Sequence, residues 1–209
     1  MQSAKTQLLL AEIIPVGGVE FSGKFVVLEY NRGMKRVMIN GGPGSGKSTL
    51  ARALGASTGL PVYHMDQIHH MPGWEPRPLP EKIKMANAIE AKDEWIFEGG
   101  LSSTYENRAT RADTLVWIDL PMTLRWFRVV KRLLTGYGKT RPDSAPDCPE
   151  KFHRETLAFW KWIWDTRHSH RDRLNKLIAD HPHLTVIHLK TRKAVGDFYA
   201  QIGQNSRDY

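Results

Sequence analysis

The stretch that decides the fold is NGGPGSGKSTL, residues 40–50. Between Gly41 and Ser48 it completes the pattern G-x-x-x-x-G-K-[ST]. An apolar run at residues 37–39 precedes it, and an amphipathic helical pattern over residues 48–57 follows, which is the strand-then-helix context that this motif requires. The pattern therefore predicts a phosphate-binding loop and disfavours a chance glycine-rich turn.

Each part of this loop is suited to holding a nucleotide. The glycines let backbone N–H groups approach an anion without a Cβ in the way, and the start of the following helix adds unpaired N–H groups. Lys47 supplies a charge for the β- and γ-phosphates, and the Ser48 hydroxyl suits Mg²⁺. We expect ATP and magnesium here. The expected nucleotide-binding residues are Gly41, Gly42, Pro43, Gly44, Ser45, Gly46, Lys47, Ser48 and Thr49.

The composition is that of an ordinary soluble globular protein. The 209 residues are 41% hydrophobic and 25% charged, within the usual range for one globular domain. No apolar run approaches the roughly 20 residues of a membrane span, and Glu12 interrupts the apolar stretch at residues 8–11, so no signal peptide is expected. The one cysteine, Cys148, has no disulfide partner and belongs to no zinc-binding cluster. Together these features predict a cytoplasmic protein.

Positive charge is concentrated in one part of the chain. The net charge is +8, and residues 125–176 alone hold 13 Lys and Arg against 6 Asp and Glu. Such a region can meet nucleic acid or the phosphates of a small substrate. Charge alone does not separate these two partners.

Hydrophobic periodicity divides the chain into an extension and one α/β domain. Residues 1–33 are the extension, which we expect to be loosely structured, with a hairpin of residues 8–14 and 25–28 as one option. In residues 34–209 short apolar runs alternate with helical patterns, which predicts a mainly parallel sheet with helices on both faces. The expected strands are residues 37–39, 61–65, 95–97, 114–118 and 184–189. The expected helices are residues 48–57, 81–91, one starting at 121, 150–179 with a break near 169, and 193–202.

Five sequence words within residues 34–202 carry a family resemblance. They are MKRVMINGGPGSGKSTLARALG, LPVYHMDQIHHMPGW, WIFEGG, ADTLVWIDLP and KTRPDSAPDCPEKF. With them the chain resembles adenylate-kinase-like P-loop proteins of the DNA topology modulation protein family. The resemblance implies a three-layer α/β/α nucleoside-phosphate-kinase-like fold with a five-stranded parallel sheet. It also implies an acceptor-binding insertion at residues 62–92 and a mobile lid at residues 136–150. The family name suggests a link to DNA topology, whereas the implied architecture is that of a small-molecule kinase.

The resemblance further implies a carboxylate that holds Mg²⁺ through water beside the loop. Glu98, which closes WIFEGG, matches this position, so Ser48 and Glu98 are the expected metal-binding residues. Related sequences often have Asp-Gly here, and this departure leaves the role of Glu98 open. Asp119 is the rival because it also ends an apolar strand. For Asp119 we favour capping of the helix that starts at Pro121.

The segment HMDQIHHMPGW follows the second strand, where strand ends form the ligand crevice of an open α/β sheet. Asp66 is the candidate to accept a substrate hydroxyl proton or to orient the acceptor, with capping of a turn as the alternative. His69 and His70 are candidates to assist, and Trp74 to stack on a ring. For these three we prefer structural roles, namely solvent-facing histidines and a tryptophan packed under the Pro-rich loop.

Arginines are expected to stabilise the oxygens of a transferring phosphoryl group, because their charge is fixed. Arg128 and Arg132 lie four residues apart on one helix and share a face. Arg141 lies in GYGKTRPD, whose glycines and proline are typical of a hinged lid. We expect Arg132 and Arg141 to be lid residues, with ordinary solvated charges as the alternative. Arg108 and Arg111 are candidates to contact the acceptor phosphate if the acceptor is a nucleotide.

The aromatic run FWKWIWDTRHSHRDR, residues 159–173, has two interpretations. Rings interleaved with cations suit single-stranded nucleic acid. Helical spacing instead directs Phe159, Trp162 and Ile163 toward the core while Lys161 and Arg167 face water. We favour the core interpretation, since no recognised nucleic-acid motif is present.

These observations predict an ATP- and Mg-dependent P-loop kinase. The expected catalytic residues are Lys47, Asp66, Arg132 and Arg141. The expected acceptor is a small molecule, either a nucleotide, a nucleoside or a metabolite, and no membrane partner is expected. The alternative is a regulatory or DNA-associated protein in which ATP binding or slow hydrolysis acts as a switch.

Overall fold

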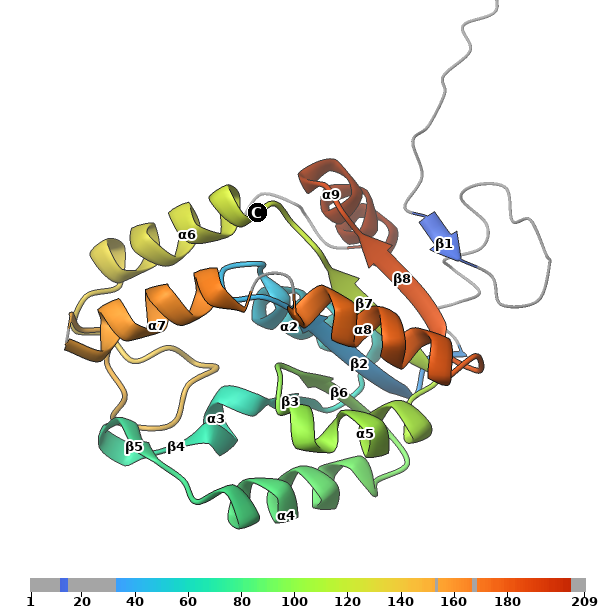
Figure 1. The fold of residues 1–209 in the computed structure, drawn as a ribbon. Helices are drawn as coiled ribbons and strands as arrows, with labels where there is room; N and C mark the ends of the chain where they lie inside the picture. Colours follow the sequence, from blue (N-terminus) through green and yellow to red (C-terminus); the bar gives the residue numbers. More distant parts are fainter. Residues whose placement is uncertain (1–11, 15–32, 153, 167–168, 204–209) are drawn as a thin grey trace, which may run out of the picture.

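The computed structural model describes residues 12–14, 33–152, 154–166 and 169–203 (Figure 1). The strands are β1 (Glu12–Ile14), β2 (Arg36–Gly41), β3 (Val62–His64), β4 (His70–Met71), β5 (Glu75–Pro76), β6 (Trp95–Glu98), β7 (Thr114–Ile118) and β8 (Thr185–Leu189). The α-helices are α2 (Lys47–Thr58), α3 (Met65–His69), α4 (Leu79–Glu90), α5 (Tyr105–Arg111), α6 (Met122–Thr135), α7 (Arg154–Asp165), α8 (Ser169–Asp180) and α9 (Arg192–Gln201). Two short 3-10 helices are η1 (Pro72–Trp74) and η2 (Ser102–Thr104).

The central sheet contains the predicted five parallel strands, in the order β3-β6-β2-β7-β8. β1 adds a sixth, antiparallel strand at the β8 edge, where Ile13 lies opposite Ile187. A hairpin of residues 8–14 with residues 25–28 is one option from the sequence, but residues 8–11 and 25–28 lie outside the described part of the chain. β4 and β5 form a separate two-stranded sheet that the sequence analysis did not predict.

Helices cover both faces of the sheet and give it three layers (Figure 1). Val37 and Ile39 of β2 join one buried cluster with α2 and α9, and Met38 between them joins the other cluster with α3, α4, α5 and α8. All three side chains are fully buried, and each contributes about 1.5–3 kcal/mol relative to exposure. Burial on both faces explains why this strand is continuously apolar in sequence.

The order in which the chain visits the strands places a crevice at the end of β2. From β2 the chain first builds β3 and β6 on one side and then crosses to β7 and β8 on the other side. In open α/β sheets ligands bind outside the carboxyl ends of the strands at such a switch point. The loop that follows β2 is the predicted phosphate loop.

Several helices differ from the sequence-based expectation. The predicted long helix at residues 150–179 is two helices, α7 and α8, and the predicted break before Ser169 is confirmed. The seven-residue helix α5 was not predicted. α7 runs alongside α6, with the rings of Trp126 and Trp160 in edge contact at 5.8 Å (Figure 1). None of the described helices is both long enough and apolar enough to cross a membrane.

Candidate active site

The phosphate loop turns directly from β2 into α2. Gly46, the N-cap of α2, has a φ of 94°, which residues with a Cβ rarely adopt. The Ser45 N–H donates to the Gly42 carbonyl at 3.1 Å, so the loop folds back on itself. The N–H of Leu50 donates to the carbonyl of Gly46 at 3.0 Å, and the N–H groups before it in the helix have no intrahelical partner.

The start of α2 is suited to an anion. Gly46 offers no capping side chain, and no acidic residue lies in the first turn. By contrast, Thr191 caps α9 by accepting the N–H of Ala194 at 3.0 Å. The free N–H groups and the positive end of the α2 dipole are therefore available to a phosphate. Lys47, half-buried, is the first residue of this helix.

Arg125 of α6 lies against the loop, and the sequence analysis did not single it out. A Cβ at position 42 would lie 1.9 Å from Nη1 of Arg125, so only glycine leaves room for this guanidinium. Its Nε donates to the carbonyl of Leu120 at 3.0 Å, which holds the side chain in place. The sequence signal that was missed is the position of Arg125 in the first turn of the helix that follows β7, three residues before Arg128.

Glu98 fits the expected water-mediated metal contact. Its pairing opposite Ile39 places it next to the start of the phosphate loop. Glu98 is 1% exposed, and its Oε1 lies 2.8 Å from Nδ1 of His64. Its buried Oε2 has no hydrogen-bond partner among the described residues. A spare carboxylate oxygen beside the loop is the type of ligand that Mg²⁺ or its bound water prefers.

Asp119 does not cap α6, so that expectation is wrong. The N-cap of α6 is Pro121, and no side chain caps the helix there. Asp119 instead accepts from Nε of Arg171 at 2.9 Å and lies 3.4 Å from Nε2 of His188. Burial raises the pKa of Asp119, but these two partners outweigh it and lower the pKa below its ordinary value. Asp119 is therefore an ionised anchor for α8 and β8.

Asp66, the predicted acceptor-orienting residue, lies in the first turn of α3, directly after β3. Its Oδ2 accepts from Nη2 of Arg141 at 3.2 Å. Burial raises the pKa of Asp66, but the charges of Lys47 and Arg141 outweigh it, and the net pKa lies below the ordinary value. Asp66 is thus an ionised carboxylate at the carboxyl end of β3, suited to accept a hydrogen bond from a hydroxyl group.

The two predicted lid arginines meet at one carboxylate. Oε1 of Glu150 lies 3.1 Å from Nε of Arg132 and 2.9 Å from Nε of Arg141. Arg141 also pairs with Asp143 at 2.5 Å. Burial lowers the pKa of Arg141, but Asp143, Asp66 and Glu150 outweigh it and the net pKa is raised. The side chains of Arg132 and Arg141 thus lie in one ion-pair network with Asp66.

The loop at residues 136–150 is held against the segment after β3. Nε2 of Gln67 donates to the carbonyl of Pro142 at 3.0 Å, and Nε1 of Trp74 donates to the carbonyl of Pro149 at 2.8 Å. The backbone N–H of Trp74 lies 3.2 Å from Sγ of Cys148. Trp74 therefore packs on the Arg-bearing loop rather than under the Pro-rich segment.

The two histidines near Asp66 are half-buried rather than solvent-facing, which corrects that expectation. Nε2 of His69 lies 2.8 Å from the carbonyl of Gly100, and His70 makes an edge contact with Trp74 at 5.0 Å. Burial is the main cause that lowers the pKa of each imidazole below its ordinary value. Both are therefore neutral at physiological pH.

Arg108 does not reach an acceptor phosphate, so that prediction is wrong. Its side chain is fully buried, with Nε donating to Glu90 at 2.9 Å and Nη1 donating to the carbonyl of Gly99 at 2.8 Å. Arg111 donates to the carbonyl of Ala91 at the end of α4 at 3.1 Å. Both arginines therefore join α5 to α4.

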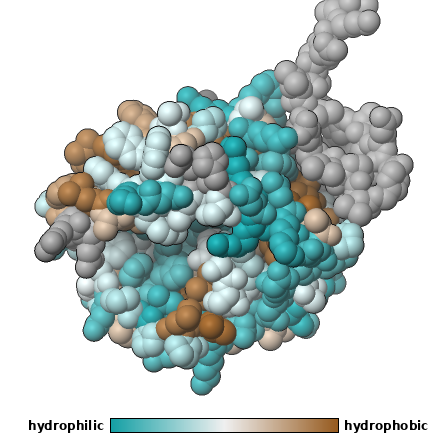
Figure 2. Space-filling view, viewed as in Figure 1, coloured by the Kyte–Doolittle hydropathy of each residue, from teal (hydrophilic) through white to brown (hydrophobic). Residues whose placement is uncertain are grey.

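The core interpretation of the aromatic run holds only in part. Ile163 is buried, but Phe159 is 38% and Trp162 is 52% exposed. The reason is that α7 lies alongside α6 instead of on the sheet, so one narrow stripe of it is covered. Hydrophobic surface is visible over α6 and α7 (Figure 2). Lys161 faces water as expected, and Arg167 lies outside the described residues.

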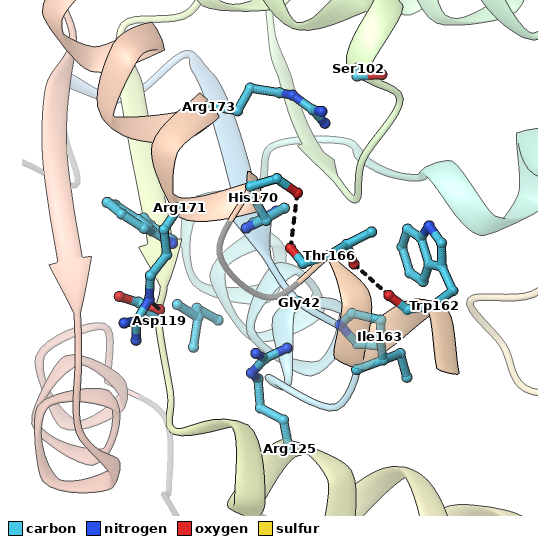
Figure 3. Close-up of a pocket in the computed structure, with 14 residues that line it drawn as sticks. Gly42, Ser102, Asp119, Arg125, Trp162, Ile163, Thr166, His170, Arg171 and Arg173 are labelled. Carbon is cyan, nitrogen blue, oxygen red and sulfur yellow. Dashed lines mark hydrogen bonds and ion pairs between the residues drawn. The ribbon is translucent and has the colours of Figure 1, made fainter. Parts of the chain in front are cut away.

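A cavity of about 300 Å³ opens beside the phosphate loop (Figure 3). Its lining comes from the loop, the carboxyl end of β7, α6, and the junction of α7 with α8. The charged or titratable residues in this lining are Asp119, Arg125, His170, Arg171 and Arg173. This cavity could not be predicted from the sequence, because its walls come from segments far apart in the chain.

Comparisons with known proteins give similarity of fold. No protein-family model and no curated protein matches the chain. Among solved structures, shikimate kinase from Acinetobacter baumannii in complex with shikimate is 14% identical, with 83% of this chain and 93% of that chain covered and a TM-score of 0.49. A sugar kinase from Janibacter sp. HTCC2649 is 15% identical, with 81% and 95% covered and a TM-score of 0.42. Likeness at this level identifies neither a substrate nor a family, so membership of the DNA topology modulation family stays a prediction.

Proposed function

We propose that this chain is a P-loop kinase that transfers the γ-phosphoryl group of Mg·ATP to a hydroxyl group of a small acceptor. The observation that carries the proposal is that Lys47 and Asp66 follow the carboxyl ends of β2 and β3, two strands of the same parallel sheet. Lys47 begins the uncapped helix of a complete phosphate loop, and its charge helps to lower the pKa of Asp66. A cationic phosphate site and an ionised carboxylate that can orient a hydroxyl group therefore lie at the same edge of the sheet.

Each of these residues would have a distinct role in phosphoryl transfer. The loop N–H groups and Lys47 would bind the β- and γ-phosphates, and Asp66 would accept the acceptor's hydroxyl proton as its oxygen bonds to the γ-phosphorus. The bond between this phosphorus and the β,γ-bridging oxygen breaks, leaving ADP. Arg132 and Arg141 would exchange their contacts with Glu150 for the phosphoryl oxygens. This exchange gives residues 136–150 the role of a lid and residues 62–92 the role of the acceptor-binding segment.

Magnesium is assigned to the same site. Ser48 and Glu98 would hold it, because Ser48 is in the first turn of α2 and Glu98 has a spare buried oxygen beside the loop. When bound, magnesium neutralises charge that develops on the β- and γ-oxygens. No group of three or more His, Cys, Asp or Glu side chains in the described residues offers a metal cage, so the nucleotide's own phosphates would complete its coordination.

The test is Lys47→Ala, with Lys193→Ala on the exposed face of α9 as a matched control. Mg·ATP binding and ADP release would be measured against a panel of nucleosides, nucleoside monophosphates and small hydroxylated metabolites. We expect the Lys47 variant to lose about 100-fold or more in transfer and the control to match the original chain. Unchanged ATP binding and transfer in Lys47→Ala would refute the proposal.

A second candidate function is DNA-associated, with ATP binding as a switch. The observation that favours it is the exposure of Trp162 and Trp164, which are 52% and 57% exposed next to Lys161 on α7. Exposed rings can stack on bases at about 1–3 kcal/mol each. Binding of single-stranded and duplex DNA would be measured over a salt series. If neither binds near physiological salt, or if Trp162→Ala leaves binding unchanged, this function is excluded.

A further inference from the structure

The cavity beside the phosphate loop carries an excess of positive charge. Arg125, Arg171 and Arg173 line it, and Asp119 is the one acidic residue in its lining. Asp119 is already bonded to Arg171 and lies close to His188. One carboxylate therefore cannot balance three guanidinium groups, and the cavity is electropositive.

Among the three arginines that line the cavity, Arg173 differs because its guanidinium is not bonded to a described residue. It extends from α8 in the direction of Ser102, on the far side of the cavity from Arg125 (Figure 3). Arg173 has no hydrogen bond or ion pair to any residue that the structure describes, whereas Nε of Arg171 is bonded to Asp119. A guanidinium can donate up to five hydrogen bonds, so Arg173 can form a bidentate contact with a carboxylate or phosphate.

The positive charges around the cavity also affect the pKa of His170, which lines it. Burial lowers its pKa to about 4, and Arg125, Lys47 and Arg173 add to this effect while Asp119 opposes it. Its Nε2 lies 3.1 Å from Oδ1 of Asn40, the β2 residue just before the loop. Oδ1 of Asn40 also accepts the N–H of Gly41, so Nε2 of His170 is the donor and the single N–H of the neutral imidazole is used there. The uncharged ring therefore borders the cavity without adding a cation to it.

The cavity borders the phosphate loop, because Gly42 and Pro43 of that loop line it. A molecule that occupies the cavity therefore lies beside the loop that would bind the β- and γ-phosphates. The cavity volume of about 300 Å³ is at the small end of the range for ligand sites, which suits a compact metabolite.

We propose that this cavity binds an anionic group of the acceptor, with Arg173 as the contacting residue, the neutral His170 ring beside it and Arg125 at its border with the phosphate loop. This inference rests on the proposed kinase function. It narrows the acceptor to a small hydroxylated molecule that also carries a carboxylate or a phosphate. The hydroxyl group is oriented by Asp66, and the anionic group determines which hydroxylated molecules are accepted.

The first experiment tests the anion site without catalysis. The full chain is loaded with Mg²⁺ and a non-hydrolysable ATP analogue, and inorganic phosphate or malonate is titrated while the His170 ring signals are followed by NMR. We expect saturable binding of one probe, weakened about 10- to 100-fold by Arg173→Gln. Lys176→Gln, an exposed cation on the same helix, should leave it unchanged. The probe that binds more tightly indicates whether the anionic group of the acceptor is a phosphate or a carboxylate. Absence of saturable binding, or binding only when the nucleotide analogue is left out, overturns the proposal.

The second experiment tests specificity in transfer. Acceptors are screened in matched pairs, each an alcohol with and without a carboxylate or phosphate, such as nucleosides against nucleoside monophosphates and polyols against hydroxy acids. We expect transfer to the charged members only, with Arg173→Gln lowering their kcat/KM about 10- to 100-fold while ATP affinity stays constant. Equal use of neutral acceptors overturns the anion site. If the probe anion binds but no acceptor is phosphorylated, the kinase function fails and the anion site stands as a binding site.

Discussion

Replacing Arg108 with methionine is expected to destabilise the fold more than any change at an exposed arginine. Arg108 and Glu90 are both 0% exposed, so Arg108→Met leaves the Glu90 carboxylate buried without its cation. Breaking a buried pair in this way costs about 3–5 kcal/mol. The change also removes the donors to the carbonyl of Gly99 and to Oγ1 of Thr104, and the contact of the guanidinium with the Phe97 ring at 3.9 Å. In a chain of this size the melting temperature should fall by about 6–20 °C.

The assay is urea unfolding followed by circular dichroism, with the melting temperature as a second measure. Arg111→Met is the control on the same helix, because Arg111 donates to an exposed backbone carbonyl and its loss should cost about 1 kcal/mol or less. The double change Glu90→Leu with Arg108→Met removes both charges and should recover much of the lost stability. Equal losses in Arg108→Met and Arg111→Met, or a double variant less stable than Arg108→Met, would refute the reasoning.

Three further predictions concern the candidate site, the loop at residues 136–150 and the buried carboxylates. Asp66→Asn should lower kcat about 100-fold or more while leaving ATP affinity unchanged, because it removes the proton acceptor; an equal loss of ATP affinity would instead place Asp66 with the donor. Trp74→Phe removes the hydrogen bond to the carbonyl of Pro149 and should weaken the docking of the 136–150 loop by about 1 kcal/mol. Limited proteolysis within residues 136–150 should then be faster than in the control Trp164→Phe, and equal rates would contradict this. Lowered pKa values at Asp66, Asp119 and Asp143 mean that these carboxylates stabilise the fold above their unfolded pKa. The free energy of unfolding should therefore fall as the pH drops below about 4, and an acid titration with a flat profile in that range would contradict the assignment.

The phosphate loop and the sheet could be predicted because their signals are local. A glycine pattern between an apolar strand and a helix fixes the loop, and continuous apolar runs fix the buried parallel strands. The position of Asp66 directly after β3 could also be predicted, because the second apolar run ends just before it. The five-strand arrangement followed from the same alternation of strands and helices.

The features that were missed depend on contacts between segments far apart in the chain. Nothing in the sequence around Gly42 indicates that the guanidinium of Arg125 lies on it. Arginine is normally a surface residue, and the sequence gives no sign that Arg108 is buried. Its burial is explained by the ion pair with Glu90 of α4. Helical spacing gave Phe159 and Trp162 the correct face for a helix packed on a sheet, but α7 packs on α6 instead.

The packing of Cys148 has a practical consequence. It is the chain's single cysteine, it is 1% exposed, and it lies within the loop at residues 136–150 against the backbone of Trp74. A small thiol-alkylating reagent can reach it only when the loop leaves the segment that contains Trp74. The ratio of the alkylation rate in the folded chain to that in urea thus measures the fraction of time that the loop is detached. A nucleotide or acceptor that holds the loop in place would be detected as slower alkylation of Cys148, without any enzymatic turnover.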